Sequence, residues 1–386
     1  MLKRILFVSM LVAAIACSAE EEKKLLEWSE EVEAEPVMPD GELGPWNDGD
    51  WWDGSGWAMV EELSDEFDGD EIDLVKWRNA SGAGGWGGRG SDYRRDNTFL
   101  DGNGLLNMRA SMIGDEADFK ELYQMIEASY CRDESMIEGD DLDPWTWDPW
   151  NYGVDGWDAT WAADNYNDIL EKGCETIGAA TLISRAMGSY GYYESRFKVS
   201  NFCMSSAFWL QGPHTIEFDI TESIGKVNHE TTTERFLTKP YEITTSVWVN
   251  TDDLAGKGGI DPQTYYHNKP LKDEFVVLGI LWEPELLTVY FNHEIAYTFS
   301  LVDRVANTDK TPIPNEVFAN VQQVIFDTEV LSGPDVGWPT MAQLEDTANN
   351  TFYVDYVRVW ARDDVDYADW VNNIQYDTHV ETASDL

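Results

Sequence analysis

One stretch of the chain shows both the kind of fold and the kind of chemistry to expect: FWLQGPHTIEFDITE, residues 208–222. The runs 206–210 and 215–222 read as β-strands because they are short, apolar and bounded by turn-forming residues. In the second run, Ile216, Phe218 and Ile220 alternate with polar residues, which is the pattern of a strand with one buried face.

The same reading extends outward in both directions from this stretch. Further strand-like runs, separated by Gly, Asn and Asp, are found at 99–109, 180–184, 190–199, 243–250, 275–282, 288–291, 321–327 and 352–360. Helical periodicity is scarce. So many short strands predict an all-β fold, a sandwich or barrel of antiparallel sheets.

Three carboxylates lie within the central strand. In a regular strand Glu217 and Asp219 share a face, and Glu222, five positions after Glu217, points to the other. A β-bulge near Ile220 and Thr221 would bring Glu222 to the face of the other two, and bulges are common beside active sites. Three acids on one face repel one another and raise one another's pKa values, so the face is expected to be wet.

This arrangement suits glycosidic bond cleavage. A retaining glycosidase uses two carboxyl groups about 5 to 5.5 Å apart, one ionised as nucleophile and one protonated as acid and later base. Asp219, between the two glutamates, is placed to hydrogen-bond the nucleophile and to separate their pKa values. A solvated acidic strand face explains the same three residues, so both interpretations stay open at this point.

Several segments resemble glycoside hydrolase family 16. The spacing Glu-x-Asp-x-x-Glu at 217–222 is similar to the bulged motif of the family's agarases, porphyranases, carrageenases and laminarinases. The segment before it, MSSAFWL at 204–210, is similar to the agar-active branch. The family's strand before the catalytic one is similar to YGYYESRFKV at 190–199. Its terminal strands are similar to LSDEF at 63–67 and FYVDYVRVW at 352–360. The resemblance covers residues 60–361.

The resemblance implies a β-jelly-roll of two curved antiparallel sheets with a concave substrate cleft. It implies Glu217 as nucleophile, Glu222 as acid/base and Asp219 as their assistant. Trp209 is expected to stack under a sugar near the cleavage point, the alternative being a tryptophan buried in the core. No cofactor is required for this catalysis.

Further substrate contacts are implied on the segment that lines the far side of the cleft in relatives. Trp86 and three arginines, Arg89, Arg94 and Arg95, fall on this segment. Arginine there is suited to ring hydroxyls or a sulfate, while exposed surface arginines are the alternative.

Two positions bear on substrate choice and on metal binding. Many agar-active relatives carry a histidine on the strand after the catalytic one, but 243–250 contains none, so His229 in the intervening segment is the candidate, with a surface histidine as the alternative. Asp355 matches a position that supplies a carboxylate to a structural calcium in many relatives, away from catalysis.

The ends of the chain read as export and tethering segments. Residues 1–16 have the charged and apolar parts of a signal peptide, and the following Cys17 resembles the lipidated residue of a bacterial lipoprotein. Ordinary cleavage and secretion are the alternative to a lipid anchor. Residues 17–56 read as an acidic tether, 57–361 as the catalytic domain and 362–386 as an acidic tail with little to bury.

A long insertion at 111–173 interrupts the strand pattern. It holds five tryptophans in a run of Asp, Asn, Gly and Pro, which favours either a loop that stacks aromatic faces on sugars or a self-packed mini-core. The pair Cys131–Cys174 would close this insertion as a disulfide in an exported protein, free thiols being the alternative.

The charge of the chain restricts its partners. With 73 Asp and Glu against 26 Lys and Arg, the 386 residues carry a formal charge of −47 and no basic run, which excludes nucleic acid as the expected partner. Such a charge suits a salty, marine medium. It also favours a neutral galactan, so the first prediction is a monomeric endo-acting β-agarase that cuts β-1,4 links.

The other functions considered differ in substrate or in class. A porphyranase follows closely because local arginines suit a sulfated galactan, then a carrageenase, then a laminarinase. From another class, a noncatalytic polysaccharide-binding lipoprotein would use the tryptophan-rich insertion for capture. Such a protein has no need of all three carboxylates, and a purely structural lipoprotein leaves them unexplained.

Overall fold

The computed structural model describes residues 57–79, 90–130, 159–212, 216–228, 239–249, 260–305, 312–331, 338–362, 370 and 374–377. The expected signal peptide, tether and Cys17 lie outside these residues, as do Trp86, Arg89, His229 and Cys131. No helix among the described residues is long and apolar enough to cross a membrane.

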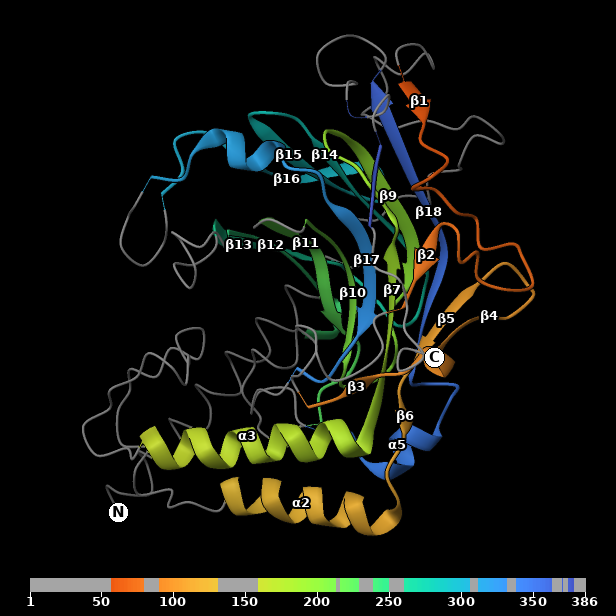
Figure 1. The fold of residues 1–386 in the computed structure, drawn as a ribbon, viewed down its shortest axis with the longest axis vertical. Helices are drawn as coiled ribbons and strands as arrows, with labels where there is room; N and C mark the ends of the chain where they lie inside the picture. The colour runs from red at the N-terminus through yellow and green to blue at the C-terminus, as the bar shows by residue number, and fades with distance from the viewer. Residues whose placement is uncertain are drawn as a thin grey trace, which may run out of the picture.

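Two large sheets form the body of the molecule (Figure 1). The eight-stranded sheet has the order β16 (Glu294–Ser300), β15 (Leu286–Phe291), β14 (Val276–Trp282), β9 (Gly191–Lys198), β18 (Thr351–Arg362), β5 (Leu106–Arg109) and β4 (Thr98–Leu100), with β1 (Trp57–Met59) also on β18. Every pairing in it is antiparallel.

The nine-stranded sheet has the order β13 (Ile260–Tyr266), β12 (Glu242–Val249), β11 (Ile216–Ile224), β10 (Ser205–Gln211), β17 (Gln323–Thr328), β7 (Ile177–Ser184) and β2 (Trp77–Arg78). β3 (Asp92–Tyr93) and β6 (Ser111–Met112) also pair with β7, β3 in parallel. Strand direction turns steadily from β7 through β10 to β13, so this sheet is strongly twisted and curved (Figure 1). The all-β, two-sheet prediction is confirmed.

The main core lies between the two sheets. Alternate residues of each sheet point inward, and they form one apolar cluster that includes Phe208, Phe218, Phe197 and Val357. Phe218 of β11 meets Trp282 of β14 edge to face, with ring centroids 5.0 Å apart. Each sheet therefore has one face in the core and one face turned away from it.

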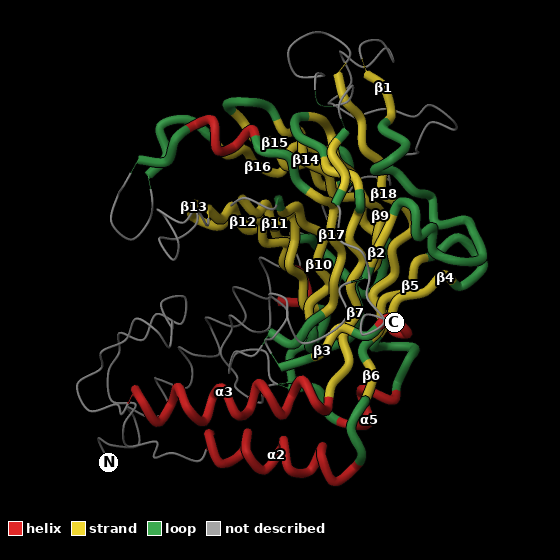
Figure 2. Tube along the Cα trace, viewed as in Figure 1, coloured by secondary structure: helices red, strands yellow, loops and turns green. Residues whose placement is uncertain are grey.

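The predicted insertion differs from the expected loop. Its described ends are two helices, α2 (Glu116–Tyr130) and α3 (Ala159–Thr176), which lie beside each other at one end of the nine-stranded sheet (Figure 2). Asp115 begins α2 by accepting hydrogen bonds from the backbone N–H groups of Ala117 and Asp118 at 2.7 and 3.0 Å.

The helices have a core of their own. Phe119, Leu122 and Ile126 of α2 and Ile169 of α3 pack with Trp338 and with Leu344 of the short helix α5 (Met341–Glu345). The described ends of the insertion are thus packed into a core, while the role expected for its tryptophans stays a prediction. Four of its tryptophans lie outside the described residues: Trp145, Trp147, Trp150 and Trp157.

The stretch after β18 also differs from the expected tail. Trp370 packs against the main core, and its Nε1 donates to the carbonyl of Tyr190 at 3.0 Å. β19 (Gln375–Tyr376) pairs with β8 (Ala186–Met187), and Asp377 accepts from Nε of Arg78 at 2.6 Å. Sequence reasoning underestimated this stretch because its few apolar residues are interspersed with Asp and Asn and show no strand or helix periodicity. Three 3-10 turns, η1 (Arg95–Asn97), η4 (Lys239–Tyr241) and η5 (Asn315–Ala319), complete the described elements.

Candidate active site

A β-bulge in β11 sets the geometry of the site. Residues 217 to 219 of β11 pair with 211 to 209 of β10, but Phe208 pairs with Thr221 and Ala207 with Glu222. Ile220 is therefore the extra residue, opposite no partner in β10. The bulge predicted near Ile220 and Thr221 is present.

The bulge places all three carboxylates on one face. Glu217, Asp219 and Glu222 are opposite Gln211, Trp209 and Ala207, which alternate along β10 and so share a face. The residues between them, with Phe208, Leu210 and Phe218 among them, belong to the main core. The carboxylates thus lie on the face of the nine-stranded sheet turned away from the core.

Asp219 is the most buried of the three and accepts two hydrogen bonds from β12. Its side chain is 4% exposed, while Glu217 and Glu222 are partly exposed. Its Oδ2 accepts from Oγ of Ser246 at 2.5 Å and from Nε1 of Trp248 at 2.8 Å. Both donors come from β12, which pairs Ser246 with Asp219 and Trp248 with Glu217.

The pKa of Asp219 is raised well above its ordinary value. Burial is the largest cause, followed by the negative charges of Glu222 and Glu217 and by a hydrogen bond to Glu217, while the Ser246 hydroxyl opposes the shift. The shift favours the neutral form of Asp219, which carries a proton between two glutamates. The arrangement can keep one carboxylic acid protonated beside two carboxyl groups that could act as nucleophile and as acid/base.

Glu217 has a further partner on β10. Nε2 of Gln211 donates to Oε2 of Glu217 at 2.8 Å. Because Gln211 and Glu217 are directly opposite in the ladder, this contact orients the glutamate across the strand pair.

Trp209 is buried on the carboxylate face. Its side chain is 6% exposed, packs with Ile183, Ala207 and Ile325, and donates from Nε1 to Oδ2 of Asp327 at 2.7 Å. This environment matches the alternative of a buried tryptophan. Stacking of its ring on a sugar stays a prediction.

Sequence reasoning missed three side chains on this face: Ser246, Trp248 and Asp327. Trp248 is 41% exposed although its indole nitrogen is bonded to Asp219, so one edge is fixed and much of its surface is open to solvent. Asp327 of β17 is 3% exposed and also accepts from Oγ of Ser205 at 3.2 Å. In the sequence these residues show only that they occupy alternate, outward positions of other strands. Which carboxylate each one faces depends on the strand register, which the sequence does not give.

The two described arginine candidates lie beside β3. Arg94 is exposed, and its Nη1 is 3.3 Å from Oδ2 of Asp92, while its backbone N–H donates to the carbonyl of Ala179 on β7. Arg95 begins η1 and is partly exposed. Substrate contact by either stays a prediction.

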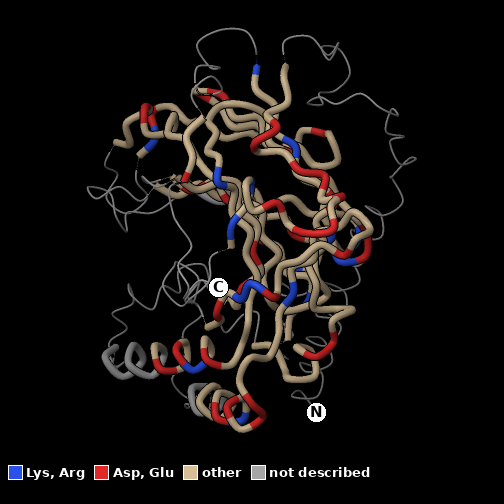
Figure 3. The backbone as a smooth tube through the Cα atoms, turned by 45° about the vertical axis from the view of Figure 1, so that its right-hand side comes forward, with Lys and Arg blue, Asp and Glu red and all other residues tan. Residues whose placement is uncertain are grey.

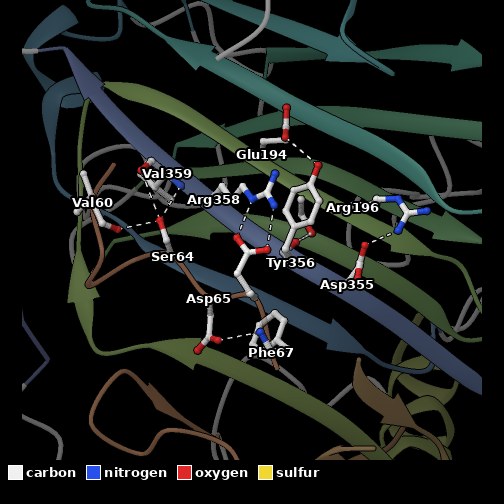
Figure 4. A network of polar contacts seen from close by, with 12 residues as sticks. Val60, Ser64, Asp65, Phe67, Glu194, Arg196, Asp355, Tyr356, Arg358 and Val359 are labelled. Carbon is white, nitrogen blue, oxygen red and sulfur yellow. Dashed lines mark hydrogen bonds and ion pairs between the residues drawn. The ribbon is translucent and has the colours of Figure 1, made fainter. Parts of the chain in front are cut away.

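Asp355 lies on the opposite sheet, far from the carboxylate strand in the topology. Its carboxylate is paired with Nη1 of Arg196 on β9, as Figure 4 shows beside the neighbouring Tyr356 and Arg358. No group of three or more His, Cys, Asp or Glu among the described residues is arranged to hold a metal. The calcium prediction is not tested by these contacts, but a calcium there would have to compete with Arg196.

The two described cysteines are free. Sγ of Cys174 is 3.4 Å from the carbonyl oxygen of Ser91. Cys203 is buried in the apolar cluster that packs on α2 and α3. Burial raises the pKa of the Cys203 thiol to about 12.

Fold and site together define a class, the β-jelly-roll proteins of the glycoside hydrolase type. Residues 144–362 match the family model described as "Beta-porphyranase A-D, GH16 domain". Since this match covers more than half of the chain, the protein belongs to glycoside hydrolase family 16, in the part of the family that holds porphyranases and agarases.

Individual relatives agree with this assignment. The chain is 23% identical over 318 residues to β-porphyranase E of Zobellia galactanivorans, covering 79% of this chain and 88% of that one. It is 25% identical over 206 residues to β-agarase AgaA of Microbulbifer thermotolerans, covering 49% and 44%. The crystal structure of porphyranase B from Zobellia galactanivorans superposes with a TM-score of 0.55 at 19% identity, covering 83% of this chain and 98% of that one.

Proposed function

We propose that the protein is an endo-acting, retaining hydrolase of β-1,4 galactosidic links in a red-algal galactan. The observation that carries the proposal is the bulge at Ile220, which puts three carboxylates on one face with a raised pKa on the central one. A solvated acidic face needs neither the bulge nor a buried aspartic acid. Membership of family 16 supports the same chemistry.

In the proposed mechanism Glu217 attacks the anomeric carbon and Glu222 donates a proton to the departing glycosidic oxygen. The bond from Glu217 to the sugar forms as the glycosidic bond breaks, and the leaving sugar departs with the proton from Glu222. In the second half, Glu222 takes a proton from water, which displaces Glu217 and regenerates both groups.

Asp219 has a positioning role in this scheme. The raised pKa favours the protonated form of Asp219, and in this form Asp219 donates its proton to Glu217. Ser246 and Trp248 hold the other oxygen, Oδ2, so the protonated oxygen is directed toward the nucleophile. Gln211 restrains Glu217 from the other side.

Agarose is the proposed substrate, because the charge of −47 disfavours approach of a densely sulfated chain. Porphyran is the second candidate, favoured by the description of the matching family model. The two differ in sulfation, so a side-by-side assay separates them.

The test is release of reducing ends from agarose, porphyran, κ-carrageenan and laminarin, by the wild type and by Glu217→Gln. We expect release from one galactan and a loss of about 10³-fold or more in kcat for the variant. Gln323→Glu is a suitable control because Gln323 lies on the same face but opposite Gln211 in β17 rather than beside the carboxylates. Binding without release by the wild type would favour the noncatalytic alternative.

A further inference from the structure

The eight-stranded sheet presents a second ordered face, on the side away from both the core and the carboxylates. On β9 the core takes Tyr193 and Phe197, so the alternate residues Arg196 and Lys198 point outward. On β18 the core takes Phe352 and Val354, which leaves Tyr353 outward.

Five side chains on this face form one straight row across five strands. Lys198 and Asn107 both pair with Tyr353, and Phe99 pairs with Asn107. Phe275 precedes β14, next to the pair of Val276 with Phe197, which places it across from Lys198. We call Phe275, Lys198, Tyr353, Asn107 and Phe99 the outer row. At about 4.8 Å per strand it spans about 19 Å.

Every aromatic ring of the outer row has a cation on it. The Lys198 ammonium is 5.8 Å from the ring centre of Phe275 and 5.2 Å from that of Tyr353. At the two ends, the guanidinium of Arg196 is 4.7 Å from the Phe275 ring and that of Arg109 is 4.9 Å from the Phe99 ring. The rings and cations are partly exposed rather than buried.

The outer row and the two arginines that lie over its rings carry an excess of positive charge in a strongly acidic chain. Arg196 is paired with Asp355, but among the described residues neither Lys198 nor Arg109 has a carboxylate within ion-pair distance. Acidic residues are spread over the described part of the chain (Figure 3). The unpaired cations therefore make this face locally positive in a chain whose net charge is −47, so an anionic group can approach it.

We propose that the outer row is a second, noncatalytic binding site for a sulfate-bearing polysaccharide chain. The flat rings of Phe275, Tyr353 and Phe99 offer stacking surfaces for successive sugar rings. Lys198 and Arg109 offer charge-assisted hydrogen bonds to sulfate oxygens between those rings. The proposal rests on the proposed function for its class of polymer. Within that class it favours porphyran, the second candidate substrate, over unsulfated agarose, and it adds a site on the sheet opposite to the carboxylates.

The site has a consequence for how the enzyme uses a polymer. A chain held on the outer face raises the local concentration of polymer near the carboxylate face without taking part in the chemistry. The site should therefore affect binding to long chains and leave the cleavage of short oligosaccharides unchanged.

The test measures binding to porphyran in about 0.5 M NaCl, where screening limits long-range repulsion from the rest of the chain. Full-length Glu217→Gln is the parent, so that the polymer is not degraded. We expect the double substitution Lys198→Gln/Tyr353→Ala to weaken the apparent Kd about fivefold, as expected for one lost stacking contact and one lost charge. Arg109→Gln/Phe99→Ala, at the other end of the row, should weaken it similarly.

Two controls separate this site from general charge and from folding. Lys120→Gln removes one positive charge from the exposed, paired Lys120 of α2 and should leave the Kd unchanged. In an otherwise wild-type background, the outer-row variants should keep the kcat/KM of the wild type on a short galactan oligosaccharide.

Several results would overturn the proposal. Unchanged porphyran binding in both double variants would do so, as would an equal loss in Lys120→Gln or an equal loss of binding to unsulfated agarose. Sedimentation that shows a dimer broken by the double variants would assign the row to a second copy of the chain instead. Failure of the wild type to hydrolyse any galactan would reject the proposed function alone, because the binding measurement does not depend on hydrolysis.

Discussion

At the residue scale, Asp219 links the electrostatics of the site to pH. Its folded-state pKa is raised above the unfolded value near 3.8, so the folded protein binds this proton more tightly than the unfolded chain does. The stabilisation is complete below the unfolded value and is lost as the pH rises through the folded-state pKa. As the pH rises and Asp219 ionises, its burial and its repulsion from the two flanking glutamates therefore reduce the free energy of unfolding.

Asp219→Asn should remove this dependence because the amide cannot ionise. We expect the difference in melting temperature, variant minus wild type, to increase as the pH rises above 4 and to level off above the folded-state pKa of Asp219. Thermal unfolding across this range measures it, with exposed Asp68→Asn as the control that should show no trend. A flat difference for Asp219→Asn would show that Asp219 titrates normally.

Trp248 tests whether the orientation of Asp219 matters. Trp248→Phe keeps an aromatic ring but removes the donor 2.8 Å from Oδ2, so Asp219 becomes free to direct its proton elsewhere. One hydrogen bond of about 1 kcal/mol corresponds to a decrease of roughly fivefold in kcat with little change in KM. Trp248→Leu should raise KM as well, because it also removes a ring that is 41% exposed. Equal kcat for Trp248→Phe and wild type would leave Trp248 with a binding role only.

At the scale of the element, the bulge in β11 places three carboxylates on one face within six residues, whereas a regular strand would need only five. Deletion of Ile220, the residue without a partner in β10, should leave Glu217, Asp219 and the former Glu222 at alternate positions of a regular strand. We expect the deletion variant to fold cooperatively and to keep measurable hydrolysis, because the pairs on both sides of the bulge are preserved.

The matched control is deletion of Phe218. That change makes Glu217 and Asp219 neighbours, so one of the two must point into the apolar core, and it also removes the ring that packs on Trp282. It should abolish cooperative unfolding. Circular dichroism melts and reducing-end release distinguish the two deletions, and loss of folding in both would mean that the bulge supplies twist the sheet requires.

The same elements show what could be predicted from the sequence. In a regular strand Glu217 and Glu222, five positions apart, would lie on opposite faces, so the spacing showed where a bulge was needed for the three carboxylates to share a face. Ser246 and Asp327 could not be found this way, since they are 27 and 118 positions from their partners and only the strand register brings them there. The helix α2 was missed although Phe119, Leu122 and Ile126 have helical spacing, because the surrounding insertion was read from its turn-forming residues.

At the scale of the whole molecule, the outward faces of the two sheets carry different kinds of side chain. One sheet turns carboxylates away from the core, and the other turns cations stacked on aromatic rings away from it. The core between them is continuous, with Phe218 behind Asp219 touching Trp282 of the opposite sheet. The proposed cleavage and binding sites therefore lie on opposite sides of one shared core.

The charge of −47 leads to a prediction for the molecule as a whole. Like charges across the surface repel in the folded state more than in the expanded chain, and the Debye length falls from about 30 Å at 0.01 M salt to about 3 Å at 1 M. We expect the melting temperature to rise by several degrees between 10 mM and 0.5 M NaCl at pH 8. Sucrose at matched osmolality is the control for solvent exclusion, and KCl should act as NaCl does because screening depends on ionic strength. A melting temperature that is independent of both salts would mean that the excess carboxylates lie too far apart, or are too well solvated, to destabilise the folded state.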